Sequence, residues 1–172
     1  MVKMIGAVLI LFAGTMIGFQ QAARFAMRPR HIRQLIHALQ RLETEIGYGY
    51  TPLPEAIERT AEHMQGAIRA MFQSVGDTLH SDKECSFREC WEQAAASHWP
   101  RTAMKAPERA SFIRLGSSLG ISDRDDQIKH LRLAVQQLQA EEEAARDDQA
   151  RYEKMSKSLG VLVAALVVIL IV

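Results

Sequence analysis

Residue types that carry metal-binding or disulfide chemistry are scarce in this sequence. It holds two cysteines, Cys85 and Cys90, whose spacing matches neither a disulfide framework nor a zinc-binding pair. Its six histidines are scattered, and no two of them have the spacing that places a pair of metal ligands on one helical face. We therefore interpret both cysteines as reduced and structurally incidental, and we expect no metal site.

Signatures of catalysis are equally sparse. The sequence has no glycine-rich phosphate loop, so any ATP that drives its system is hydrolysed by another protein. Glu43 and Glu45 lie two residues apart and cannot share one helical face as an acid and base pair. We therefore expect a protein that is not an enzyme and needs no cofactor. The alternative is an enzyme with an unrecognised site, which a turnover abolished by a single point substitution would support.

Neither sign of charge is in excess in the middle of the chain. The sequence has 20 acidic and 21 basic residues, and all of them except Lys3 lie between Arg24 and Ser158. This segment is formally neutral, so it lacks the basic excess with which proteins neutralise nucleic-acid phosphates. We expect no nucleic-acid partner.

Two apolar stretches without charge stand at the ends, Met4 to Phe19 and Leu159 to Val172. Extended to Phe25, the first gives about 22 helical residues, or roughly 33 Å, which suffices for a hydrocarbon core of about 30 Å. The second is about 21 Å long and spans only if flanking residues sink in or the bilayer thins. We predict membrane anchors over residues 1–26 and 159–172.

Each anchor prediction has an alternative. The first stretch could be a cleaved signal peptide, although it is not followed by a clear cleavage site with small residues at alternate positions. The second could be a helix buried in a core, although it has no polar face. Basic residues flank both stretches on the side of the middle segment, which by the positive-inside rule predicts a cytoplasmic middle domain. These residues are Arg24, Arg28, Arg30, Arg33, Arg41, Lys154 and Lys157.

Apolar residues of the middle segment recur at steps of three and four, the period of amphipathic helices. The first stripe runs from Ile32 to Ile46. A new helix is expected to begin at Pro52, with Thr51 as its N-cap. A later helix buries one face made of Phe87, Cys90, Trp91, Ala94 and Ala95. No segment alternates with period two as a strand does. We predict an all-α protein, a small antiparallel helical bundle over residues 27–138 between the N-terminal and C-terminal transmembrane helices.

A long final helix is expected from the capping box of Ser122 and Asp125, because no glycine or proline follows before Gly160. Its apolar stripe has heptad spacing as far as Leu138 and should end there. Residues 139–151 are polar nearly all round. We predict that residues 139–158 form a polar helical stalk that bridges through solvent to the membrane.

A block rich in tyrosine and glycine follows the first amphipathic stripe. It reads Leu42-Glu43-Thr44-Glu45-Ile46-Gly47-Tyr48-Gly49-Tyr50-Thr51-Pro52-Leu53, followed by Glu55-Ala56. Further blocks are Arg28-Pro29-Arg30 with Ile32-Arg33-Gln34-Leu35, Leu119-Gly120 with Asp123-Arg124, Gln127 and Lys129-His130, and Glu153-Lys154-Met155 with Lys157-Ser158-Leu159-Gly160. In order and spacing these blocks resemble the stage III sporulation protein AB family of endospore-forming bacteria. The resemblance covers nearly the whole chain and is weakest from His80 to Lys105.

The resemblance implies a cytoplasmic domain similar to those of the inner-membrane platform proteins of type II secretion. It implies a non-enzymatic platform subunit of the channel complex between mother cell and forespore, in the cell membrane on the mother-cell side. The implied partners are the secretion-ATPase-like protein of the same operon, other membrane subunits of the channel complex, and membrane lipid. The alternative is a membrane-tethered helical adaptor that binds a single cytosolic partner.

Surface positions within the matching blocks are the candidates for partner binding. We expect the ATPase to dock near the first turn or near the start of the long final helix, on Glu43, Glu45, Tyr48, Asp123, Arg124, Lys129 and His130. The alternative interpretation is that these residues cap helices and fix turns. In that interpretation Tyr48 and Tyr50 pack inside the turn and set the angle between two helices.

Overall fold

The computed structural model describes residues 2–81 and 85–171, with side chains described for residues 25–81, 85–152, 154 and 155. In this part the chain is all helical and contains no strand, which confirms the predicted all-α class. The α-helices are α1 (Val2–Gly47), α2 (Leu53–Glu62), α3 (Gly66–Ser81), α4 (Phe87–His98), α5 (Ala106–Leu119) and α6 (Arg124–Ile171), and a 3-10 turn, η1 (Trp99–Arg101), follows α4.

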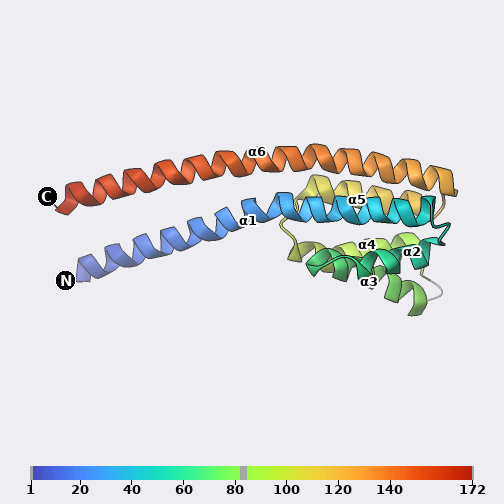
Figure 1. The fold of residues 1–172 in the computed structure, drawn as a ribbon. Helices are drawn as coiled ribbons and strands as arrows, with labels where there is room; N and C mark the ends of the chain where they lie inside the picture. Colours follow the sequence, from blue (N-terminus) through green and yellow to red (C-terminus); the bar gives the residue numbers. More distant parts are fainter. Residues whose placement is uncertain (1, 82–84, 172) are drawn as a thin grey trace.

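Two long antiparallel helices, α1 and α6, run the length of the molecule and make its most extensive helix pair (Figure 1). Both extend well beyond the bundle, so the two ends of the chain lie at the same end of the molecule. Helix α1 continues through Pro29, which lies within it. The shorter helices α2 to α5 cover one half of α1 and α6 and complete a bundle at the other end (Figure 1).

The bundle core is aliphatic along α1 and aromatic between α4 and α5. The rings of Trp91 and Phe112 stack with their centroids 4.2 Å apart, and Trp91 Nε1 donates a hydrogen bond to the Phe112 carbonyl at 2.8 Å. Gly116 lets this indole lie against α5, because a Cβ there would come 2.1 Å from the Trp91 ring. The predicted face of α4 is buried at Cys90, Trp91, Ala94 and Ala95 and partly buried at Phe87. The Cys90 thiol contacts the Cys85 sulfur at 2.6 Å.

Two predicted helix starts are shifted by one residue. Asp123, and not Ser122, caps α6, because its Oδ1 accepts a hydrogen bond from the Asp126 amide at 2.9 Å. Helix α2 begins at Leu53, one residue after Pro52, and the Thr51 hydroxyl points to the Glu45 carboxylate instead of capping it. Both differences are no larger than the one or two residues by which assignments of helix ends vary.

The prediction that the packed stripe of the last helix ends near Leu138 is wrong. Ala145, two turns further on, is 1% exposed, and Glu142 is 8% exposed. Still further along, the rings of Phe25 and Tyr152 stack at 4.5 Å between centroids. Helix α6 therefore packs on α1 through most of the segment that was expected to be a solvent-bridging stalk. Its polar character reflects ion pairs with α1, which a single-helix periodicity cannot reveal.

The predicted anchors over residues 1–26 and 159–172 lie almost entirely on residues whose side chains are outside the described part. Among the residues that were searched, no helix is long and apolar enough to cross a membrane.

Candidate interaction surface

Two turns meet at the end of the bundle farthest from the chain termini, one between α1 and α2 and one between α5 and α6 (Figure 1). The Arg124 guanidinium joins them, since its Nε donates to the Ile46 carbonyl at 2.8 Å and its Nη2 to the Gly47 carbonyl. These two carbonyls belong to the last turn of α1, where no helical N–H group remains to donate to them. We call this end the tip and define it by Tyr48, Tyr50, Ile121, Asp123 and Arg124.

The backbone of the tip is held in an unusual conformation. Tyr50 has a φ of 53°, in the left-handed region that a bulky residue seldom adopts. Its ring lies 3.5 Å from the Arg124 guanidinium carbon, which gives a cation–π contact across the two turns. Gly49 permits the tight turn, because a Cβ there would come 2.6 Å from the Glu45 carbonyl oxygen.

Large apolar side chains at the tip point into solvent. Tyr48 is 85% exposed, Tyr50 is 77% exposed and Ile121 is 89% exposed. Exposed apolar side chains gathered in one place mark protein interaction sites, and tyrosine is among the residues enriched there. The interpretation of Tyr48 as a packed turn residue is therefore wrong, whereas Tyr50 does contact a neighbouring element through Arg124. The sequence pattern also missed Ile121, a lone aliphatic residue directly after the glycine that ends α5.

The predicted binding residues of α1 differ in how accessible they are. Glu43 accepts a hydrogen bond from Arg132 Nε at 2.6 Å and so ties α1 to α6 near the tip. Glu45 is more enclosed, with its side chain 15% exposed and its carboxylate 3.5 Å from both Arg41 and Arg59. Glu45 thus stabilises the junction of α1 and α2, while Glu43 lies at the rim of the candidate surface.

The predicted binding residues of α6 lie in its first two turns, next to the tip. Lys129 pairs with Asp126 at 2.8 Å, and this exposed pair raises the pKa of Lys129 and lowers the pKa of Asp126. Asp123 is exposed and caps the helix, and His130 is half-buried. The structure thus brings both predicted sets, those of α1 and those of α6, to one end of the bundle.

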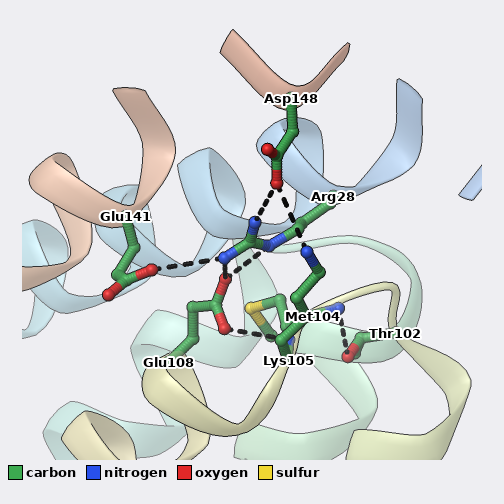
Figure 2. Close-up of polar contacts among 7 residues, drawn as sticks. All are labelled: Arg28, Thr102, Met104, Lys105, Glu108, Glu141 and Asp148. Atoms are coloured by element: carbon green, nitrogen blue, oxygen red, sulfur yellow. Dashed lines mark hydrogen bonds and ion pairs between the residues drawn. The ribbon is translucent and has the colours of Figure 1, made fainter. Parts of the chain in front are cut away.

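The opposite end of the bundle holds a charge cluster centred on buried Arg28 and Glu108, which we call the neck and define by Arg28, Lys105, Glu108, Glu141 and Asp148 (Figure 2). Arg28 is 5% exposed, and its Nε donates to Glu108, which is 0% exposed, at 2.8 Å. The same guanidinium reaches Glu141 and Asp148 on α6, each at 3.2 Å. One arginine of α1 therefore binds carboxylates from α5 and α6 at once.

Two contacts beside the neck extend this network. Glu142 accepts hydrogen bonds from Arg33 at 2.8 Å and from Arg146 at 2.7 Å. Burial raises the pKa of Glu142, but the two arginines outweigh it, so its pKa lies below the usual value. His31 Nδ1 accepts a hydrogen bond from the Ala103 amide at 2.9 Å, and burial lowers the pKa of this imidazole.

Catalytic geometry is not apparent in the described part of the chain. Gly116, Ser118 and Gly120 have the Gly-x-Ser-x-Gly spacing of a nucleophile elbow. They lie at the end of α5, however, where a strand-to-helix turn is required, and the Ser118 hydroxyl donates to the Arg114 carbonyl at 3.3 Å. No group of three potential metal ligands occurs among the described residues.

Comparison with known proteins agrees with the resemblance in the sequence blocks. The family model described as stage III sporulation protein AB matches residues 3–172. Stage III sporulation protein AB of Bacillus subtilis (strain 168) is 40% identical over 171 residues, which cover 99% of each chain. A solved structure of a stage III sporulation protein AB superposes with a TM-score of 0.67 at 38% identity, covering 73% of this chain and 98% of that one. The chain therefore belongs to the stage III sporulation protein AB family and is a sporulation protein.

Proposed function

We propose that this sporulation protein is a non-enzymatic platform subunit that docks a cytoplasmic partner at its tip and is held to the membrane by its two ends. The observation that carries the proposal is the position of the tip. Its exposed Tyr48 and Ile121 lie in the turns that follow α1 and α5, and these turns are at the end of the bundle opposite both chain termini. A subunit that is anchored in a membrane at one end and carries a binding surface at the other is suited to hold a partner at a fixed distance from the membrane.

The membrane part of the proposal rests on the apolar stretches from Met4 to Phe19 and from Leu159 to Val172. Helix α1 runs through the first stretch and α6 through the second, and both helices leave the bundle on the same side (Figure 1). Two anchors on one side, with basic flanks toward the bundle, support a cytoplasmic bundle in the mother cell that faces the forespore membrane.

The partner that we propose is the secretion-ATPase-like protein of the same operon, together with the other membrane subunits of the channel complex and membrane lipid. The tip supplies apolar contacts through Tyr48 and Ile121, and Asp123 and Lys129 supply charges of both signs at its edge. Interfaces commonly combine an apolar centre with a polar rim in this way. A membrane-tethered adaptor with a single cytosolic partner is the alternative function.

Copurification of the tagged full-length chain from sporulating cells tests the proposal. Recovery of the secretion-ATPase-like protein with membrane subunits is the expected result. Recovery of a single soluble protein, without that ATPase and without any membrane subunit, would favour the adaptor. A gene deletion adds an independent test, since intact late transcription in the forespore after deletion would contradict a role in the channel complex.

A further inference from the structure

A shallow groove runs between α4 and α5, away from both the tip and the neck. It has a volume of about 790 Å³ and is lined by Glu92 and Ala96 of α4 and by Ala106, Arg109, Ala110, Ile113 and Arg114 of α5. Ala106, Ala110 and Ile113 are spaced by four and three residues, so they lie on one face of α5. The floor of the groove is therefore apolar and follows the helix axis for about 10 Å.

Alanines make this groove accessible to a helix. Ala96, Ala106 and Ala110 are all exposed and have side chains too short to close the gap between α4 and α5. A third helix that lies between two packed helices places its own ridge of side chains in such a gap. An amphipathic helix in a groove is a recurrent mode of peptide recognition.

The charge of the groove is positive. Arg109 and Arg114 are exposed, and neither side chain makes an ion pair or hydrogen bond with another described residue. Glu92, the acidic residue of the lining, already binds Arg88 at 2.7 Å. Two unpaired arginines therefore line the apolar floor, and the one carboxylate of the lining is already neutralised by Arg88.

We propose that the groove between α4 and α5 binds an amphipathic helix of another protein, with an apolar stripe flanked by carboxylates that pair with Arg109 and Arg114. A second copy of this chain fits poorly as the occupant. Its most acidic helical stretch lies near the neck, where Glu141, Glu142 and Asp148 already bind arginines of α1. The interaction is distinct from docking at the tip, so either can fail while the other holds.

Site-specific photocrosslinking in sporulating cells tests the proposal with the full-length chain. p-Benzoylphenylalanine in place of Ala110 lies on the groove floor, and mass spectrometry identifies the peptide joined to it. We expect a peptide from another protein whose helical wheel shows an apolar stripe beside Asp or Glu. A peptide of this chain, a lipid adduct, or no crosslink would overturn the proposal.

Charge reversal supplies the second readout. Arg109→Glu with Arg114→Glu places like charges against the proposed carboxylates and should lower the crosslink yield about tenfold or more. Arg69→Glu is the matched control, because Arg69 is also exposed, lies on α3 outside the groove, and makes no ion pair among the described side chains. An equal yield in the double variant and the control would contradict the charge argument. Thermal unfolding of each variant excludes a folding defect as the cause of any loss.

Discussion

At the neck, Arg28 is 5% exposed and binds three carboxylates, whereas at the tip Tyr48 is 85% exposed and Ile121 is 89% exposed. Both regions join the same pair of long helices, α1 and α6, at opposite ends of one bundle (Figure 1). At the neck the buried charges are paired with each other, while at the tip apolar side chains are exposed to water. This difference indicates that the neck holds the helices in register and that the tip is available for assembly.

Buried charges at the neck have a structural consequence. An arginine enclosed by carboxylates from other helices allows few alternative arrangements, because separating it from Glu108 would leave two buried charges unpaired. Lys105 adds to this restriction by binding Asp148 at 3.3 Å, and Glu108 also accepts the Lys105 amide at 2.9 Å (Figure 2). The point where α1 and α6 leave the bundle is therefore held by polar contacts among α1, α5 and α6.

The largest effect is expected from breaking the neck. Arg28→Met leaves Glu108 buried without its cation, and removal of one partner from a buried ion pair costs about 3–5 kcal/mol. Denaturant unfolding of the full chain in detergent, followed by circular dichroism, measures the loss. The double variant Arg28→Met with Glu108→Gln should recover more than half of it, because the buried charge is then absent. Equal stability of the single and double variants would contradict a structural role of this pair.

A smaller loss is expected from straining the turn at the tip. Gly49→Ala places a Cβ 2.6 Å from the Glu45 carbonyl oxygen and 2.8 Å from the Thr51 hydroxyl, and such overpacking costs about 1–3 kcal/mol. Gly47→Ala is the matched control, since its Cβ would meet only Ile128, at an ordinary 3.6 Å. In thermal unfolding, the melting temperature of Gly49→Ala should lie well below that of Gly47→Ala. The reverse order would contradict the tight turn at Gly49.

A pH dependence of about 1 kcal/mol, the worth of one hydrogen bond, is expected from His31. Its pKa is lowered by burial below the ordinary 6.5, so the unfolded chain binds the proton more tightly than the folded one does. The stability due to this residue is complete above pH 6.5 and is lost as pH falls through the folded-state pKa. His31→Asn keeps an acceptor for the Ala103 amide but cannot titrate. Unfolding curves from pH 7.5 to 5 should therefore fall more steeply for the wild type than for the variant.

The sequence predicted the elements of the fold well because the helices are strongly amphipathic and are punctuated by glycine and proline. The stripe from Ile32 to Ile46 and the buried face of Trp91 both appear as expected. The extent of α6 packing could not be predicted, because buried Glu142 binds Arg33, which lies on another helix far away in sequence. A periodicity analysis treats such a glutamate as solvent-exposed.

The candidate site was partly predictable for the same reason. The block around Tyr48 and the block around Arg124 are each visible in the sequence as candidate surface, and yet only the fold shows that they adjoin. The link is made by Arg124 and the carbonyls of Ile46 and Gly47, which are backbone groups without a sequence signal. Ile121 was missed because one apolar residue after a helix end carries no periodicity.

The central claim, that the tip binds a partner without supporting the fold, is tested most directly by Tyr48→Ala combined with Ile121→Ser. Both side chains lie in solvent, so the free energy of unfolding should change by no more than about 0.5 kcal/mol. Copurification of the secretion-ATPase-like protein with the full-length variant from sporulating cells should fall about tenfold or more, as expected for the loss of interface anchors. Unchanged recovery of that ATPase, or a loss that appears only together with destabilisation, would contradict the account.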